Sequence, residues 1–193
     1  EKTFNGILAS GLGSLWWGVI GVLYFKSVSF VSPLELTIHR TIWTAFLLIF
    51  TISIYSKWKE VFKILKDYKT TCLLILTSIL IVGNWFTWIY AVTVNKLIDA
   101  AFGYYIFPIL SVFFGILFLK EAHNKMKLFS IALVIIAVIY LLIDLNSTPW
   151  IGLIVALTWS VYTLIRKKIK ISTDIGLFIE SAFMTPFAII ILL

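Results

Sequence analysis

Residues 32–50 read SPLELTIHRTIWTAFLLIF, an apolar run that carries three ionisable side chains in its first half, Glu35, His39 and Arg40. An ionised side chain at the centre of a membrane helix costs about 2.5–3.5 kcal/mol on insertion scales, so it persists mainly where it has a partner or lines a water-filled path. Pro33 suits the first turn of a helix. The run therefore predicts a membrane-spanning helix whose ionisable residues are the first candidates for function.

The composition of the whole chain indicates a membrane protein. Of 193 residues, 61% are hydrophobic and 13% are charged, and the mean hydropathy is +1.05. Soluble domains average about 45–50% apolar and about 25% charged residues. Seven apolar segments reach the roughly 17–25 residues that a span needs. They occupy 4–25, 33–56, 71–95, 99–119, 128–144, 149–166 and 175–193. We expect an all-α, polytopic bundle of transmembrane helices with short connections.

The distribution of basic residues predicts the orientation of this bundle. The longer polar stretch 57–70 reads KWKEVFKILKDYKT, and its apolar residues recur at helical spacing, which favours a short helix in the membrane interface. With a cytoplasmic amino terminus, thirteen of the 16 Lys and Arg residues fall in cytoplasmic segments. Basic residues concentrate in cytoplasmic loops. The sequence therefore predicts a membrane protein with its amino terminus in the cytoplasm, and its net charge of +7 needs no nucleic-acid partner.

Motifs for metal or nucleotide chemistry are missing from the sequence. The single cysteine, Cys72, excludes an intrachain disulfide framework and a cysteine metal cluster. The two histidines, His39 and His123, are far apart, and neither an HExxH zinc motif nor a GxxxxGK phosphate loop occurs. We expect no cofactor, no metal site and no enzymatic activity, and an ATP-driven pump is disfavoured.

A faint internal repeat links the first apolar segment to the sixth. The first contains LWWGVIGVLYFKS and the sixth contains LTWSVYTLIRKKI, which align with Trp17 on Trp159. In the segments that follow, this alignment makes Glu35 the counterpart of Glu180. Five spans separate the two copies, so they have opposite orientations, as in the inverted repeats of many secondary transporters.

The repeat divides the chain into two units. Residues 1–147 are expected to form a first repeat of five helices, and residues 148–193 to form the start of a second, inverted repeat. On this interpretation the chain is a fragment with about seven of ten spans, and it lacks the last three.

Two interpretations of the charged residues in the second span are open. Glu35 and His39 are four apart and share a helix face, whereas Arg40 lies one step further round. Arg40 is roughly 10 Å into the span at 1.5 Å per residue. It has either a role in substrate binding or gating, or a salt bridge with Glu35 or another acid that locks the bundle.

The two carboxylates of the repeat suggest a coupling hypothesis. Glu35 and Glu180 are expected near opposite membrane faces, an arrangement that fits alternating access, and either could carry a proton. Because Glu180 has no Arg or His close in sequence, it is the better candidate. Alternatively, both residues simply occupy helix starts, where the helix dipole favours negative charge.

The third and fourth spans add candidates for a binding cavity. In GNWFTWIYAVTVN, Asn84 and Trp88 share a face, which suits a cavity for an amphipathic or cationic solute, although Asn84 could instead bond a neighbouring helix. The fourth span contains Tyr104 and Tyr105, and we expect Gly103 and Pro108 to interrupt it. Broken helices mark binding sites in transporters, but proline is also ordinary in membrane helices.

Small residues outside these motifs are expected to act in packing. Gly152 and Ala156 in the sixth span are examples. Such residues let the backbones of neighbouring helices approach closely.

These motifs, taken together and in order, resemble a known family. SPLELTIHRTIW, GNWFTWIYAVTVNK, DAAFGYYIFPILSVFFGILFLKE, PWIGLIVALTWSVYTLIRKK and GLFIESAFMTPFA are similar to the RarD branch of the EamA-like drug/metabolite transporter superfamily. The resemblance runs from about Gly11 to the carboxy end. It implies ten helices in two inverted halves, a cytoplasmic amino end and no ATP hydrolysis. Where the family usually has Ser-Leu-Gly before the tyrosine, this chain has Ala101-Phe102-Gly103. The matching positions are Glu35, His39, Arg40, Asn84, Trp85, Gly103, Tyr104, Pro108, Arg166, Lys167, Glu180 and Pro186.

Together with this resemblance, the sequence predicts a secondary transporter in the bacterial inner membrane that works by alternating access. Its expected cargo is a small organic solute, such as an amino-acid-like or cationic metabolite or a drug. Its partners are the solute and the lipid bilayer, with protons as a hypothesis and a homodimer left open. The alternatives are a membrane-embedded enzyme acting on lipids and a structural subunit, which predicts an Arg40–Glu35 pair with no cavity beside it. The candidate substrate-binding or gating residues are Glu35, His39, Arg40, Asn84, Trp85, Trp88, Tyr104, Tyr105, Pro108 and Glu180.

Overall fold

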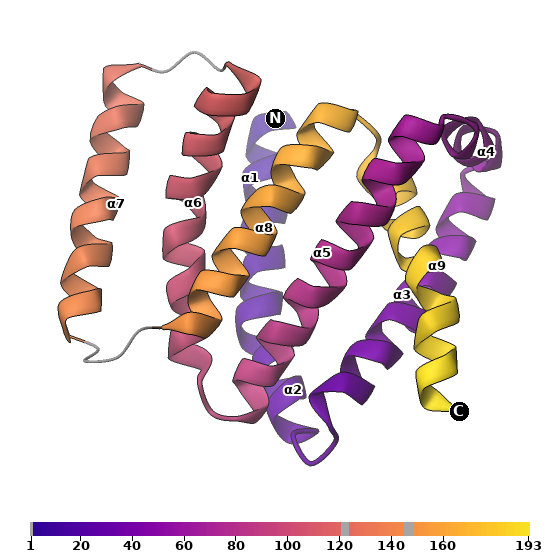
Figure 1. Ribbon diagram of the computed structural model, residues 1–193, viewed down its shortest axis with the longest axis horizontal. Helices are drawn as coiled ribbons and strands as arrows, with labels where there is room; N and C mark the ends of the chain where they lie inside the picture. The colour runs from indigo at the N-terminus through magenta and orange to yellow at the C-terminus, as the bar shows by residue number, and fades with distance from the viewer. Residues whose placement is uncertain (1, 121–123, 145–148) are drawn as a thin grey trace.

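The computed structural model describes residues 2–120, 124–144 and 149–193, and all regular structure in these ranges is helical (Figure 1). The all-α bundle expected from the sequence is confirmed. The elements are α1 (Lys2–Leu15), η1 (Trp16–Gly21), α2 (Val22–Ser27), α3 (Pro33–Ile54), α4 (Trp58–Lys66), α5 (Tyr68–Thr93), α6 (Leu97–Leu119), α7 (Lys125–Asp144), α8 (Trp150–Ile169) and α9 (Thr173–Leu192).

Helices lie at all seven predicted apolar segments. Five stretches in the described ranges are long and apolar enough to cross a membrane, namely Phe4–Ser27 and the helices α3, α5, α6 and α9. In α7 the apolar part is shorter, Leu128–Tyr140, and α8 ends in basic residues. Consecutive long helices run in opposite directions, because the connections between them are short (Figure 1). The first span and α8 consequently have opposite orientations, as the proposed repeat requires.

The basic segments gather at one end of the bundle. In Figure 1 the amino terminus, α4, the start of α7 and the end of α8 all lie at the upper end. Helix α4 is the short amphipathic helix predicted within 57–70, with Val61 buried and Lys63 and Lys66 exposed. Lys57 reaches from the turn before α4 to Asp174 in the first turn of α9, with Nζ and Oδ2 2.5 Å apart. This pair fastens α9 to the turn between α3 and α4.

Apolar clusters at both ends of the bundle hold the long helices together. At the end near α4, Ile52, Leu74 and Ile175 join α3, α5 and α9. At the other end, Phe25 packs against Trp88 and joins the first span to α5. The region between these clusters is where the side chains discussed below meet.

Helices α6 and α8 approach each other closely at two glycines. A Cβ at Gly103 would overlap the carbonyl oxygen of Gly152, and a Cβ at Gly152 would overlap that of Asp99. The expectation that Gly152 permits close packing is therefore confirmed. Gly103 has the same role, and the prediction that Gly103 and Pro108 interrupt this span is wrong. Helix α6 runs through both, because neighbouring helices and local adjustment let a membrane helix tolerate proline.

The irregular helix is instead the first one. Residues 16–21 form a single π-helical element, η1, within the otherwise α-helical span. Such widened turns are frequent at functional sites. At Gly21 a Cβ would lie 3.2 Å from the ring of Trp17, so the glycine leaves room for this indole to lie against its own helix. No proline marks this position in the sequence, which explains why the irregularity was not predicted.

Candidate functional site

Side chains from five elements enclose a central cavity of about 270 Å³. The lining consists of one arginine, one amide and five aromatic rings. Helix α3 contributes Arg40 and α6 contributes Tyr104. The remaining lining residues are Trp17 from η1, Asn84, Trp85 and Trp88 from α5, and Trp159 from α8. Five residues that the sequence nominated therefore meet in one cavity.

The guanidinium of Arg40 lies over two indole rings. Its central carbon is 4.6 Å from the ring centroid of Trp17 and 4.1 Å from that of Trp85. Cation–π contacts of this kind stabilise a charge by about 2 kcal/mol or more when they are shielded from water. Nη1 of Arg40 is buried and has no hydrogen-bond partner in the described part of the chain. The side chain is thus held in place by aromatic faces while at least one of its donors stays unused.

The pattern of α3 directs Arg40 inward. Leu36, one turn earlier, is buried against α5 and the first span, so Arg40 four residues on faces the same neighbours. The adjacent threonines, Thr37 and Thr41, donate their hydroxyl protons to the carbonyls of Pro33 and Thr37 at 2.7 and 2.8 Å. Their polar groups are satisfied within α3 and do not compete for Arg40.

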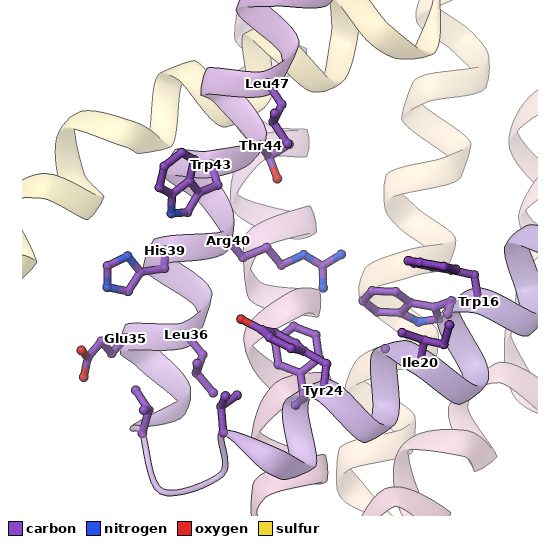
Figure 2. Close-up of a pocket in the computed structure, with 15 residues that line it drawn as sticks. Trp16, Ile20, Tyr24, Glu35, Leu36, His39, Arg40, Trp43, Thr44 and Leu47 are labelled. Carbon is purple, nitrogen blue, oxygen red and sulfur yellow. The ribbon is translucent and has the colours of Figure 1, made fainter.

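The Arg40–Glu35 salt bridge, one form of the alternative interpretation of Arg40, is not formed. Five residues place two side chains roughly 140° apart around a helix. In Figure 2 the Glu35 and His39 side chains point to the opposite side of α3 from Arg40. Both are exposed, and they share a face as predicted. Glu35 is the third residue of α3, and its N–H donates to the Ser32 hydroxyl at 3.2 Å, which fits the helix-start interpretation.

An open groove of about 810 Å³ adjoins the central cavity (Figure 2). It lies between the first span and α3, and Glu35 and His39 line it together with Trp16, Tyr24 and Trp43. Trp17 and Arg40 line both spaces. These two side chains therefore form the partition between an open approach and an aromatic cavity.

Asn84 joins two helices and lines the cavity as well. Its side chain is 4% exposed, and Nδ2 donates to the carbonyl of Val155 at 3.1 Å and to the hydroxyl of Thr158 at 2.9 Å. The amide nitrogen thus ties α5 to α8, as the packing alternative predicted. On the same face of α5, Trp88 packs against Trp17 with ring centroids 4.8 Å apart.

Two nominated residues of α6 lie outside the cavity. Tyr105 is 59% exposed and Pro108 is also exposed. Tyr104 alone of this group is among the lining residues. Adjacent positions of a helix point about 100° apart, so Tyr104 and Tyr105 cannot share one pocket wall.

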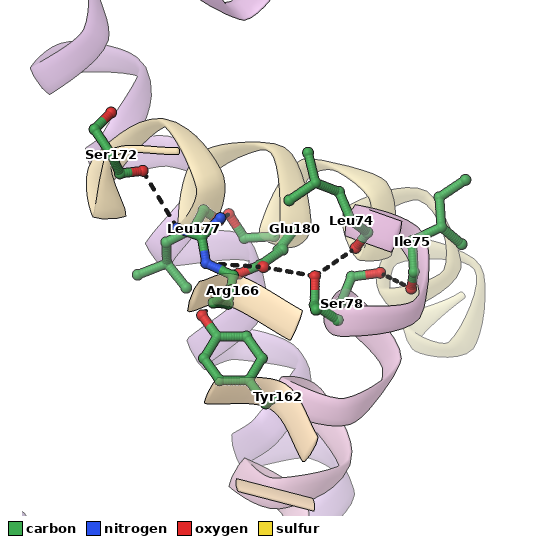
Figure 3. A network of polar contacts seen from close by, with 10 residues as sticks. Leu74, Ile75, Ser78, Tyr162, Arg166, Ser172, Leu177 and Glu180 are labelled. Carbon is green, nitrogen blue, oxygen red and sulfur yellow. Dashed lines mark hydrogen bonds and ion pairs between the residues drawn. The ribbon is translucent and has the colours of Figure 1, made fainter. Parts of the chain in front are cut away.

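Glu180 lies in a separate buried network beyond the cavity (Figure 3). The residue is 0% exposed. Oε1 accepts a hydrogen bond from the Thr77 hydroxyl at 2.7 Å, and Oε2 accepts one from the Tyr162 hydroxyl at 3.0 Å. Nε of Arg166 lies 3.6 Å from Oε1. Three helices, α5, α8 and α9, therefore converge on one carboxylate.

This network corrects two expectations about Glu180. Its cationic partner is Arg166, which lies in the last turn of α8 and reaches α9 because a short turn joins these helices and both pack against α5. It is also not the positional counterpart of Glu35. Glu180 is the eighth residue of α9, whereas Glu35 is the third residue of α3. The eighth residue of α3 is Arg40, so the two helices carry opposite charges at the same distance from their starts.

Gly176 makes room for Arg166. A Cβ at Gly176 would overlap the guanidinium, so the arginine lies directly against the backbone of α9. Nη2 of Arg166 donates to the carbonyl of Ser172 at 3.3 Å. The ion pair with Glu180 therefore depends on the absence of a side chain one turn earlier on the same helix.

A ring contact joins the two sites. Trp159, which lines the cavity, stacks on Tyr162 with centroids 5.3 Å apart and ring planes 19° apart. Tyr162 donates to Glu180. The wall of the cavity and the buried carboxylate are thus connected through two residues of α8.

Comparison with known proteins identifies the family. Residues 4–143 match the family model of EamA-like transporters. The chain belongs to the EamA-like transporter family. This confirms the resemblance drawn from the sequence motifs.

Curated relatives of this EamA family member match it over nearly its whole length. It is 37% identical over 189 residues to an uncharacterized transporter of Vibrio cholerae, spanning 98% of this chain and 62% of the relative. It is 31% identical to protein RarD of Escherichia coli K12, spanning 100% and 64%, and 32% identical to the uncharacterized transporter YojE of Bacillus subtilis, spanning 97% and 64%. The chain thus spans just under two thirds of the length of these relatives. No solved structure matches it.

The sequence did not reveal several residues of this EamA protein's two sites. The sequence indicates Trp17 and Trp159 only as aligned positions of the internal repeat, yet both line the cavity. Arg166 was a position of family resemblance without an assigned partner. Thr77 and Gly176 carried no signal, because their roles depend on which helices become neighbours. The apolar helices and the transporter relatives make the protein an integral membrane protein.

Proposed function

We propose that this EamA family member is part of a secondary transporter that moves a small organic solute across the bacterial inner membrane by alternating access. The observation that carries the proposal is the placement of Arg40 in an aromatic cavity without a carboxylate partner in the described part of the chain. Charges inside membrane proteins mark substrate and ion pathways. Arg40, Trp85 and Tyr104 are the proposed core of the solute site.

The groove beside the cavity supports a path for the solute. Arg40 and Trp17 separate an open space of about 810 Å³ from the enclosed space of about 270 Å³. Movement of these two side chains would connect the spaces, so they serve as a gate as well as a binding surface. Trp17 belongs to the π-helical element, a geometry that is frequent at functional sites.

The geometry disfavours a purely structural role. A structural subunit predicts an Arg40–Glu35 pair with no cavity beside it, and Arg40 instead lines two spaces and points away from Glu35. A lipid-modifying enzyme calls for acids or histidines gathered at one membrane face. Glu35 and His39 line an exposed groove, whereas Glu180 is buried in another part of the bundle. The named relatives are transporters, which agrees with the proposal.

The two-repeat architecture also belongs to the proposal. We infer that residues 1–147 form one five-helix repeat and that residues 148–193 begin an inverted second one. The family match over 4–143 supports this division. The proposed repeat pairs Trp17 with Trp159, and both line one cavity, as equivalent residues near the axis of an inverted repeat would.

The proposed orientation places the basic end of the bundle in the cytoplasm. That end carries α4 and the carboxyl end of α8 (Figure 1). Cytoplasmic loops carry an excess of Lys and Arg. The amino terminus is then cytoplasmic, and the Glu180 network lies toward the cytoplasmic side of the cavity.

Protons are proposed as the coupling ion. The buried Glu180 carboxylate has one cationic partner in the described ranges, Arg166, and a proton would compete with it. Protonation would release Arg166 and loosen the junction of α8 and α9. Because Tyr162 links Glu180 to Trp159, this change would reach the cavity wall.

Solute counterflow tests the proposed function. The full-length natural protein would be reconstituted into liposomes preloaded with phenylalanine, phenylacetate or phenethylamine, and entry of the same radiolabelled compound would be followed. We expect accelerated exchange of at least one compound relative to protein-free liposomes. A folded protein that exchanges none of the three would contradict the proposal.

A further inference from the structure

We propose that the solute of the central cavity carries a carboxylate on a small aromatic body, with Arg40 binding the carboxylate and the indole rings binding the body. This inference rests on the proposed function and names its substrate class. It differs from the expectation of a cationic solute, because Arg40 gives the cavity a positive charge.

The central cavity has a positive charge. Arg40 is the one ionised side chain among the lining residues, whose other members are aromatic rings and the Asn84 amide. The groups around the guanidinium are neutral on every neighbouring element, with Trp17 on η1, Trp85 on α5 and Tyr104 on α6. On its own helix, Glu35 and His39 point away. A cationic solute would meet like charge here, whereas an anion would neutralise it.

Arg40 has a hydrogen-bond donor that no protein group uses in the described part of the chain. The central carbon of the guanidinium lies 4.6 Å from the ring centroid of Trp17 and 4.1 Å from that of Trp85, and neither ring offers a carboxylate or carbonyl acceptor. Nη1 has no hydrogen-bond partner in the described ranges. Arginine donors form a planar fork that matches a carboxylate with two parallel hydrogen bonds. A carboxylate in that plane would satisfy the unused donor and neutralise the charge together.

The cavity is small and its walls are mostly aromatic. Sites for drug-sized ligands measure about 300–1,000 Å³, so a cavity of about 270 Å³ suits a smaller molecule. Trp88 and Trp159 complete the aromatic lining. The amide nitrogen of Asn84 already bonds α8, so it offers no competing donor. A single ring fits these walls by stacking and edge-to-face contact.

Matched ligands on one ring test this substrate class. Thermal unfolding of the full-length protein in detergent would be followed with phenylacetate, phenethylamine and 2-phenylethanol, which share a ring and differ in charge. A ligand that binds only the folded state raises the Tm. We expect phenylacetate to raise the Tm by several degrees and the other two to raise it much less. Equal stabilisation by 2-phenylethanol, stronger stabilisation by phenethylamine, or none by phenylacetate at millimolar concentration would overturn the inference.

Variants locate the effect at Arg40. Arg40→Gln should weaken phenylacetate binding by roughly tenfold or more, since a hydrogen bond to a charged group is lost. Arg40→Lys keeps the charge without the planar fork and should retain weaker binding. Lys96→Gln removes an exposed charge outside the cavity and should bind like the unmodified protein. Undiminished binding by Arg40→Gln would overturn the inference.

The binding assay and the counterflow assay can fail independently. Charge-selective binding that depends on Arg40 in a protein with no counterflow would leave the carboxylate site standing and contradict transport. Counterflow of phenethylamine that is blocked by loss of Arg40 would support transport and contradict the carboxylate class.

Discussion

The guanidinium of Arg166 occupies the space that a side chain at Gly176 would fill. This places its Nε 3.6 Å from the fully buried carboxylate of Glu180. A residue without a side chain thus determines whether a carboxylate one turn away has a cationic partner. The arrangement is one of packing, and a single methyl group can test it.

We expect Gly176→Ala to destabilise the protein by about 1–3 kcal/mol, because the displaced arginine leaves a buried carboxylate with a weaker partner. The measurement is thermal unfolding in detergent. Gly83→Ala is the matched control, since nothing lies within 4 Å of a Cβ at Gly83. Replacing a helical glycine by alanine stabilises a helix by roughly 0.5–1 kcal/mol. A stabilising effect of Gly176→Ala equal to that of the control would show that Arg166 is not held in this position.

The close contact between α6 and α8 leaves no space for a side chain at Gly152. Gly152→Ala inserts a methyl group where the carbonyl of Asp99 lies, so we expect the two helices to separate and the Tm to fall. The loss should be of the order of 1–3 kcal/mol, as for overpacked cores. Because α6 carries Tyr104 into the cavity, ligand binding should weaken as well. An unchanged Tm together with unchanged binding would contradict the close approach.

The buried carboxylate makes a prediction about coupling. In proteoliposomes of the full-length protein, we expect Glu180→Gln to remove the dependence of solute uptake on an imposed pH gradient. The glutamine side chain has no carboxylate that could take up and release a proton. Glu35→Gln is the control, since Glu35 is exposed at the start of α3 and should leave the dependence intact. If uptake by the unmodified protein does not depend on the pH gradient, the coupling proposal is contradicted and facilitated diffusion is the remaining mechanism.

The orientation of the bundle can be tested by labelling. Lys66→Cys and Lys96→Cys, each in a Cys72→Ala background, place a thiol at opposite ends of the bundle. With an impermeant maleimide added outside intact cells, we expect labelling at position 96 and none at position 66. The expectation follows from the concentration of basic residues at the α4 end. The reverse labelling pattern would place the basic end outside.

The sequence predicted the helices well and the contacts less well. Hydropathy marked each long segment because apolar length alone defines a span. The sequence singled out Arg40 by its depth in the second span, and the structure places it in the wall of the central cavity. Its aromatic partner Trp17 could not be predicted, because that contact depends on the packing of the first span against α3 and α5 and on the π-helical element that carries this tryptophan.

The partners of two charged residues show the same physical limit of the sequence. Spacing along the chain offered Glu35 as one possible partner of Arg40 and no nearby cation for Glu180. Helical geometry turns Glu35 away from Arg40, and the short turn from α8 into α9 brings Arg166 to Glu180. Local spacing predicts which residues share a helix face, but partners across helices require the fold.

The role of Arg40 is tested most directly by counterflow of a transported compound in full-length Arg40→Gln, compared with Lys96→Gln at equal amounts of folded protein. Arg40 lines both the cavity and the groove, and its charge has no carboxylate partner in the described part of the chain. We predict that Arg40→Gln inserts and folds but loses exchange by at least about tenfold, as expected for the loss of a hydrogen bond to a charged group, while Lys96→Gln exchanges normally. Normal exchange by folded Arg40→Gln would contradict a solute site at this arginine.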